Sequence, residues 1–143
     1  MAVQTILFAC VHNAGRSQMA AALFNQVADP AKAVALSAGT RPGTAVHPEV
    51  REAMGELGID LSSARPRLLT EELARGVNML ITMGCGEECP YVPGVGRDDW
   101  ALPDPKGRPM EEVRAIRDDI RTRVAALVAS RGWGQPADAG QSS

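Results

Sequence analysis

The chain has 143 residues, a length that predicts one globular domain with a real hydrophobic core. Hydrophobic residues make up 45% and charged residues 22%, and a formal net charge of −2 excludes the strongly basic surface that nucleic acid or an anionic membrane would recruit. No apolar stretch is long enough to span a bilayer and the N-terminus lacks a secretory signal pattern, so we expect a cytoplasmic protein that binds neither nucleic acid nor membrane.

The first half of the chain alternates predicted strands and helices. Residues 3–9 form an apolar run, which predicts a buried strand that ends at Cys10. The elements expected after it are a helix from Ser17 to about residue 29, a strand over 33–38, a helix over 48–57 and a short helix over 70–75.

The second half continues the same alternation. The elements expected here are a buried strand over 78–83, a Gly/Pro-rich loop over 84–97, a short strand over 99–102 and a helix over 110–127. Apolar residues in the last helix recur at spacings of three and four. We expect residues 1–130 to form a single domain and residues 131–143, rich in Gly, Pro and Ser, to be a disordered tail.

This order of elements predicts an α/β fold in which helices cover both faces of a parallel sheet. In such sheets, ligands bind at the carboxyl ends of the strands. Cys10, Cys85 and Asp104 each follow a predicted strand, so we expect them to meet at one rim of the sheet.

The segment after Cys10 has the features of an oxyanion-binding loop. Backbone N–H groups of such a loop can form a nest for a tetrahedral anion, and the helix that opens after it adds the positive end of its dipole. Arg16 can hold two anion oxygens through its planar fork, and Ser17 is placed to hydrogen-bond a Cys10 thiolate. The candidate anion-binding residues are Val11, His12, Asn13, Ala14, Gly15 and Arg16.

Cysteine and arginine with five residues between them are also compatible with a buried strand-end thiol and a surface charge. The preceding strand, the following serine and the helix that opens at the arginine favour the anion-binding interpretation. Asn13 can brace the loop by bonding its backbone, and His12 either lines the mouth or is an ordinary polar loop residue.

The motif "CVHNAGRSQMA" resembles the phosphate-binding loop of the low-molecular-weight protein tyrosine phosphatases and of the arsenate reductases that share their fold. The resemblance extends over residues 3–127 and includes "LSAGT", "ITMGCGEECP", "DDWALPDP" and "VRAIRDDI". It implies a four-stranded parallel sheet flanked by helices, and a covalent intermediate between Cys10 and the oxyanion.

Asp104 lies between two prolines, which restrict its backbone. By itself Pro-Asp-Pro is also a simple turn. The resemblance implies that Asp104 is the general acid that protonates the leaving oxygen. Lys106 follows, and aromatic residues make up only 3% of the chain, which favours a small inorganic oxyanion over an aryl phosphate. Trp100 is expected to pack in the core.

Two further cysteines, Cys85 and Cys89, are not needed to hydrolyse a phosphate ester. The resemblance implies a relay in which Cys10 attacks arsenate, Cys85 attacks Cys10 to release arsenite, and Cys89 then forms a disulfide with Cys85. Two alternatives stay open: structural cysteines without reactivity, or a zinc site or metal-sensing module built from the three thiols. A tyrosine phosphatase is a further alternative.

The electron donor implied by the resemblance is external, so we expect no bound cofactor. Thioredoxin fits a chain with its own resolving pair, and the alternative is arsenic transfer to a small thiol such as mycothiol with a glutaredoxin-like partner. Only three residues separate Cys85 from Cys89, fewer than in the best-known thioredoxin-coupled arsenate reductases. A few relatives bind potassium through an acid on the first helix, where this chain has Ala21, so we expect no metal site. We also expect a monomer.

Overall fold

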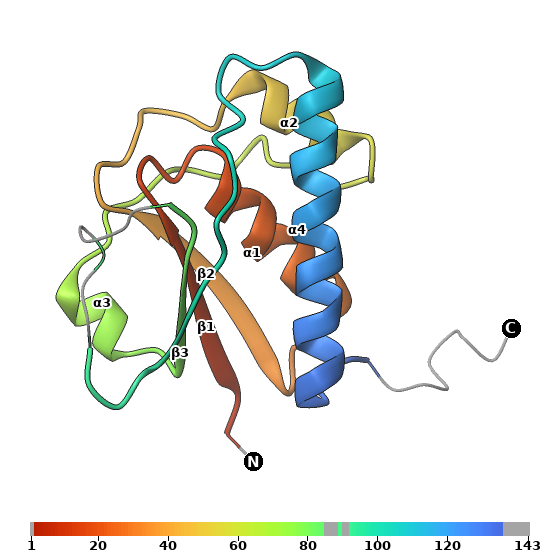
Figure 1. The fold of residues 1–143 in the computed structure, drawn as a ribbon. Coiled ribbons are helices and arrows are strands. Elements are labelled where there is room, and N and C mark those ends of the chain that lie inside the picture. Colours follow the sequence, from red (N-terminus) through yellow and green to blue (C-terminus); the bar gives the residue numbers. More distant parts are fainter. Residues whose placement is uncertain (1, 85–88, 90–91, 136–143) are drawn as a thin grey trace, which may run out of the picture.

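The computed structural model describes residues 2–84, 89 and 92–135. The strands are β1 (Gln4–Cys10), β2 (Ala33–Gly39), β3 (Met79–Thr82) and β4 (Gly96–Asp99), and the helices are α1 (Arg16–Val27), α2 (Pro48–Gly55), α3 (Glu71–Arg75) and α4 (Met110–Arg131). The four strands form one parallel sheet in the order β2-β1-β3-β4 (Figure 1). The predicted α/β class with a four-stranded parallel sheet is thus confirmed.

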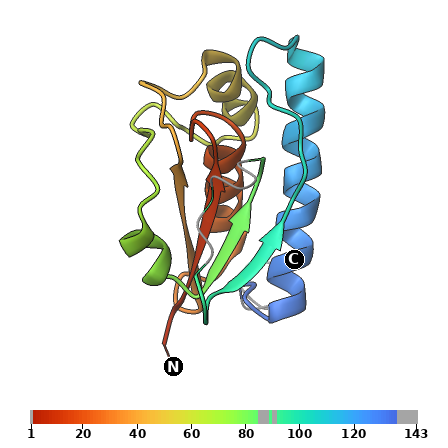
Figure 2. The same cartoon turned by 60° about the vertical axis from the view of Figure 1, so that its left-hand side comes forward.

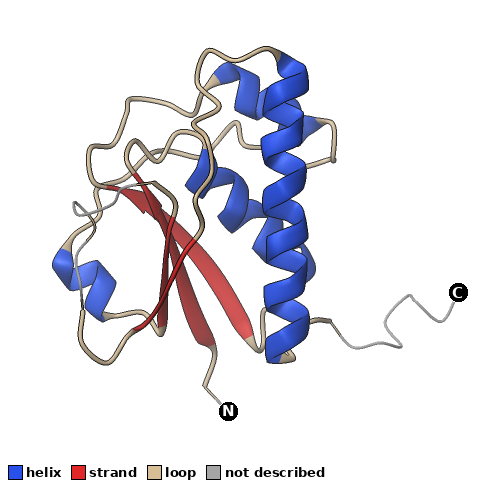
Figure 3. Cartoon of the chain, viewed as in Figure 1, coloured by secondary structure: helices blue, strands red, loops and turns tan. Residues whose placement is uncertain are grey.

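Helices cover both faces of the sheet (Figures 2 and 3). The alternation of β1 explains this, because successive side chains of a strand point to opposite faces. Ile6 and Phe8 belong to the larger core, together with residues of α1 and α4. Leu7 and Ala9 belong to a smaller core beneath α3. Since both faces of the strand are buried from Ile6 to Cys10, this part of β1 reads as a continuous apolar run.

Aromatic residues occupy the centre of the larger core. The ring of Phe8 lies 6.1 Å from that of Phe24 on α1 and 5.5 Å from that of Trp100. Trp100 is only 6% exposed, so its predicted packing in the core is confirmed. Among the described residues, no helix is both long and apolar enough to cross a membrane.

The fourth strand is shifted from the predicted range of 99–102 to Gly96–Asp99. Its register pairs Met79 with Gly96 and Thr82 with Asp99. All four residues of β4 are exposed at the edge of the sheet, so they lack the apolar pattern that marks a buried strand. The apolar residues Trp100 and Leu102 are buried just beyond the strand. Their alternation in the sequence explains why the strand was predicted over 99–102.

The predicted tail begins too early, because the residues after α4 pack against the body of the protein. Gly132 adopts a left-handed conformation (φ 70°) and ends the helix. The Trp133 ring then packs 6.0 Å from that of Phe24, and Gly134 forms a bridge with Ala28. An aromatic residue can therefore anchor a segment of otherwise polar composition. The rest of the predicted tail, 136–143, lies outside the described residues.

A salt-bridge cluster joins the end of α2 to α4. From this cluster we predict that the stability of the fold depends on pH in the acid range. Glu56 accepts hydrogen bonds from Arg114 and Arg117, which lower its pKa to about 2. A lowered pKa stabilises the fold above the unfolded-state value of 4.5, and this contribution is lost as the pH falls towards 2. We expect Glu56→Gln to lower the free energy of unfolding at pH 7, with the difference from wild type shrinking between pH 4.5 and 2.

Urea unfolding across this pH range measures the effect. Glu72→Gln, at an exposed position of α3, is the control and should change the free energy of unfolding less than Glu56→Gln does. A constant difference between Glu56→Gln and wild type from pH 7 to pH 2 would contradict the assigned role of the Glu56 carboxylate.

Candidate active site

The loop between β1 and α1 places the Cys10 thiol at the carboxyl end of the central strands. Cys10 is 2% exposed, and its Sγ lies 2.9 Å from Ser17 Oγ. The Asn13 backbone N–H also points at the sulfur, with a distance of 3.3 Å between Asn13 N and Cys10 Sγ. Asn13 Nδ2 donates to Ser17 Oγ at 2.7 Å, which leaves the serine hydrogen free to point at the sulfur. Two donors can therefore stabilise a thiolate at this position.

The segment after β2 turns the amides of this loop inwards. Thr40, Arg41 and Gly43 donate backbone N–H groups to the carbonyls of residues 10, 11 and 12, at 3.2, 2.8 and 2.9 Å. His47 N donates to Ala14 O at 3.0 Å. In a trans peptide the following N–H points away from the carbonyl, so the N–H groups of these peptide units face the interior of the loop. Inward-facing N–H groups of this kind are what the predicted anion-binding nest requires.

Gly39, the last residue of β2, allows this close support. A Cβ at this position would lie 2.6 Å from Val11 O and 2.8 Å from Asn13 N. Any side chain would therefore push the loop away from β2. The glycine in the "LSAGT" motif is required by the approach of two backbone segments.

Asn13 is the internal brace of the loop. It is fully buried, and it is the one residue other than glycine in the described part of the chain with a positive φ, 51°. Asn13 Oδ1 accepts from Gln18 Nε2 at 3.2 Å and from Arg67 N at 2.9 Å. Gln18 Nε2 also donates to Arg65 O at 3.2 Å. We had expected Asn13 to bond the backbone of its own loop, but its side chain bonds Ser17 and Gln18 on α1 and the backbone N–H of Arg67.

Replacing Asn13 tests this brace. Asn13→Ala removes buried hydrogen bonds and puts a residue that tolerates the left-handed region less well than Asn at φ 51°, so we expect a loss of roughly 2–4 kcal/mol in the free energy of unfolding. Asn13→Gly removes the same hydrogen bonds but tolerates the backbone conformation, and should recover about 1 kcal/mol of that loss. Urea unfolding of both variants checks the difference. Equal stability of the two variants would show that the left-handed conformation carries no cost.

Arg16 links the anion-binding loop to the Asp104 segment. Its side chain is 9% exposed, its Nη1 donates to Leu102 O at 3.1 Å, and its Nη2 lies 3.9 Å from Asp104 Oδ2. Arg16 Nε is buried without a hydrogen-bond partner. Pro105 packs over Gly15, since a Cβ there would lie 2.9 Å from Pro105 Cγ. Cys10, Arg16 and Asp104 therefore lie at one rim of the sheet.

The Asp104 carboxylate is 41% exposed, and several groups hold its segment. Lys106 N donates to Asp104 Oδ1 at 3.0 Å, and Arg108 Nε donates to Asp104 O at 2.6 Å. Glu49 on α2 accepts from Gly107 N at 2.8 Å, and the pKa of Glu49 is lowered by its own backbone N–H and by that of Gly107. The Asp104 side chain is thus partly exposed on a backbone held by hydrogen bonds, and its role as a proton donor stays a prediction.

The cysteines differ in state and in position. Cys10 is a free thiol, whereas Cys89 is disulfide-bonded and 5% exposed. Cys89 packs in the smaller core with Leu7 and Ala9, and Cys10 belongs to the larger core. Cys85 lies outside the described residues. No group of three potential metal-ligating His, Cys, Asp or Glu side chains occurs in the described ranges.

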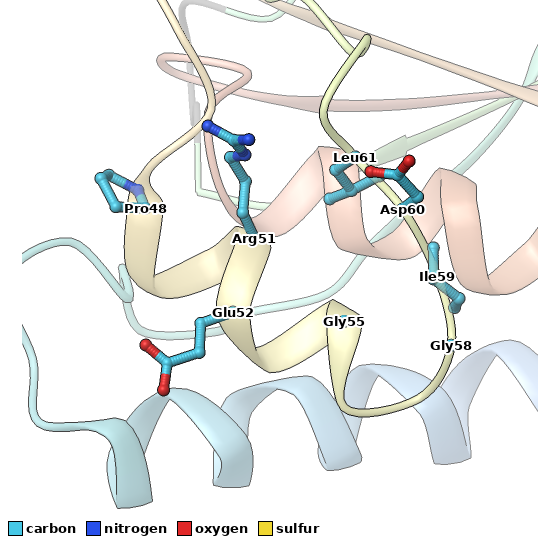
Figure 4. A pocket seen from close by; sticks show the side chains of 8 residues that line it. All are labelled: Pro48, Arg51, Glu52, Gly55, Gly58, Ile59, Asp60 and Leu61. Carbon is cyan, nitrogen blue, oxygen red and sulfur yellow. The ribbon is translucent and has the colours of Figure 1, made fainter.

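Several residues of the site were not predicted. Leu102 and Gly84 contact Arg16 from distant parts of the chain, and Gln18 on α1 donates to Asn13 O at 3.0 Å, so none of these contacts leaves a periodic signal in the sequence. A pocket of about 510 Å³ beside α2 is a separate feature (Figure 4). Its lining includes Arg51, Glu52 and Asp60, and none of the predicted site residues.

A buried thiol beneath inward-facing amides, beside a buried arginine and an exposed carboxylate, is the geometry that the hypothesis of a cysteine-dependent oxyanion site on an α/β fold requires. Residues 5–132 match the family described as low molecular weight phosphotyrosine protein phosphatase, and the chain belongs to this family. The resemblance read from the motifs is thereby confirmed.

Relatives similar to the chain are named as arsenate reductases. A putative arsenate reductase of Halobacterium salinarum is 43% identical over 84% of this chain and 87% of its own length. An arsenate reductase of Staphylococcus aureus is 33% identical over 87% of this chain and 95% of its own length. The thioredoxin-dependent arsenate reductase of Corynebacterium glutamicum superposes with a TM-score of 0.78 and 40% identity over 90% of this chain. The chain spans 61% of that protein's length.

Proposed function

We propose that the chain is an arsenate reductase that passes electrons through Cys10, Cys85 and Cys89. The observation that carries the proposal is the combination of a Cys10 thiol placed within reach of the Ser17 hydroxyl and the Asn13 backbone N–H with two further cysteines, Cys85 and Cys89, in the same chain. A phosphatase needs only the first of these features. The names and the identity of the relatives support the same substrate.

In the first step, the Cys10 thiolate attacks the arsenic atom of bound arsenate. The loop amides and Arg16 bind the arsenate oxygens, and the thiolate accepts from Ser17 and from the Asn13 amide. An S–As bond forms and one oxygen leaves, protonated by Asp104, as water. Arsenic is still pentavalent at this point.

In the second step, the Cys85 thiolate attacks Cys10 Sγ and breaks the S–As bond. The bonding electron pair goes to arsenic, which leaves as trivalent arsenite, and Cys10 and Cys85 become disulfide-bonded. Cys89 then attacks Cys85 Sγ and displaces the Cys10 thiolate. The net change is the reduction of one arsenate by two thiols, with formation of one disulfide and one water, so no resident cofactor is required.

We propose thioredoxin as the dithiol that reduces the final disulfide. The thioredoxin dependence named for the Corynebacterium glutamicum protein supports this donor. Reduction of Cys85–Cys89 by a dithiol restores the starting enzyme and balances the two electrons delivered to arsenic. A small thiol that accepts arsenic from Cys10 directly is the competing route.

The test mixes fully reduced protein with a slight excess of arsenate and no external reductant. We expect one arsenite per protein, a loss of two thiols, and a Cys85–Cys89 disulfide found by mass spectrometry after alkylation. Persistence of all three thiols until a small thiol is added would replace the relay by the transfer route. Rapid hydrolysis of aryl phosphate without arsenite formation would identify a phosphatase instead.

A further inference from the structure

The guanidinium of Arg16 lies in a narrow slot against the backbone of Gly84. A Cβ on Gly84 would lie 2.3 Å from Arg16 Nη1 and 3.2 Å from Arg16 Cζ. On its other side, Arg16 Nη1 donates to Leu102 O at 3.1 Å. The guanidinium is therefore held between the residue that follows the β3 region and the segment that leads to Asp104. A side chain at position 84 would therefore require the Arg16 guanidinium to move from this slot.

The contacts divide the donors of Arg16 into two sets. Nη1 is used by the protein scaffold, at Leu102. Nε is buried without a partner, and among the described residues only Thr40 Oγ1 shares this state. A buried donor without an acceptor is costly, so Nε is reserved for a ligand. The edge formed by Nε and Nη2 is the edge that can make a bidentate contact with an oxyanion.

We propose that Gly84 is a positioning residue for oxyanion binding. By fixing Nη1 in its slot, Gly84 and Leu102 aim the remaining edge of Arg16 at the anion above Cys10. The proposal rests on the proposed function only in that Arg16 binds an oxyanion. Because Cys85 follows Gly84 directly, the glycine that orients Arg16 also begins the segment that carries the first resolving thiol.

Gly84→Ala tests the slot, with Gly94→Ala as its matched control. Both glycines have a positive φ, 104° and 86°, but a Cβ on Gly94 would meet no atom within 4 Å. Protection of Cys10 from alkylation by inorganic phosphate, followed on the Cys10 peptide by mass spectrometry, reports occupancy of the loop. We expect Gly84→Ala to raise the phosphate concentration for half-protection at least about tenfold, as for one misplaced charge-assisted hydrogen bond, and Gly94→Ala to leave it unchanged.

A double-mutant cycle separates a contact with Arg16 from general backbone strain. In an Arg16→Lys background the planar fork is absent, so Gly84→Ala should cause little further change in phosphate protection or in the midpoint of thermal unfolding. Equal effects of Gly84→Ala in both backgrounds would overturn the proposal. The Gly84→Ala variant could fail to fold in the wild-type background. In that case, folding of the double variant Arg16→Lys/Gly84→Ala supports the slot. If the double variant also fails to fold while Gly94→Ala folds, the proposal is refuted.

This experiment does not depend on arsenate chemistry. A wild-type protein that binds phosphate at Cys10 but forms no arsenite would refute the reductase proposal and leave the role of Gly84 intact. Conversely, normal phosphate protection in Gly84→Ala would refute the positioning role while the relay could still operate.

Discussion

Cys89→Ser is expected to complete one reduction of arsenate and then stop. Cys10 and Cys85 still suffice to release one arsenite, but no tethered thiol remains to free Cys10 from its disulfide. Tethering supplies the attacking group at a high effective concentration, so its loss should lower thioredoxin-coupled steady-state turnover by roughly 100-fold or more. Quenched-flow measurement of arsenite should show a burst of one equivalent, and mass spectrometry should find a Cys10–Cys85 disulfide.

Two controls separate the relay from a loss of structure. Cys89 is 5% exposed in the smaller core, so Cys89→Ala, which introduces no polar atom, should show the same burst and arrest. Cys85→Ser should yield neither arsenite nor disulfide, because the S–As bond is never attacked. Phosphate should still protect Cys10 in all three variants. Unchanged steady-state turnover of Cys89→Ser would refute the relay.

The positions of Cys10 and Arg16 were predictable because they depend on local order along the chain. A continuous apolar strand that ends at a cysteine, followed by five loop residues and a helix, defines the loop without knowledge of the rest of the fold. The sheet was predictable for a related reason. Burial of β1, β2 and β3 leaves apolar runs that can be read directly from the sequence.

The supporting contacts could not be predicted because they join segments far apart in the chain. Arg67 N bonds Asn13, 54 residues earlier, and Leu102 O bonds Arg16, 86 residues earlier. Pairing at such distances depends on topology rather than on a local pattern. The range of the edge strand β4 was predicted wrongly because its residues are exposed and leave no apolar run in the sequence. Pairing with β3, rather than burial, determines where β4 begins and ends.

Asp104→Asn is expected to slow the formation of the Cys10–arsenic adduct by about 10²–10⁴-fold, the usual contribution of a general acid. An amide in the same place accepts the hydrogen bond from Lys106 N and keeps the segment in position, but it cannot deliver a proton to the leaving oxygen. The step can be followed in single turnover by the loss of the free Cys10 thiol. Glu111→Gln, on the exposed surface of α4, is the control and should react like wild type.

In Asp104→Asn, phosphate binding at Cys10 should respond differently from the rate of adduct formation. This difference separates a role in proton donation from a structural role. Asp104 Oδ2 lies 3.9 Å from Arg16 Nη2, so an ionised carboxylate competes for the positive charge that binds the anion. Neutralising it should leave phosphate protection of Cys10 unchanged or stronger, while the chemical rate falls. A variant that merely disordered the segment would lose both, because Arg16 would lose its contact with Leu102 O. Loss of binding in parallel with rate would therefore assign Asp104 to holding Arg16 rather than to protonating the leaving oxygen.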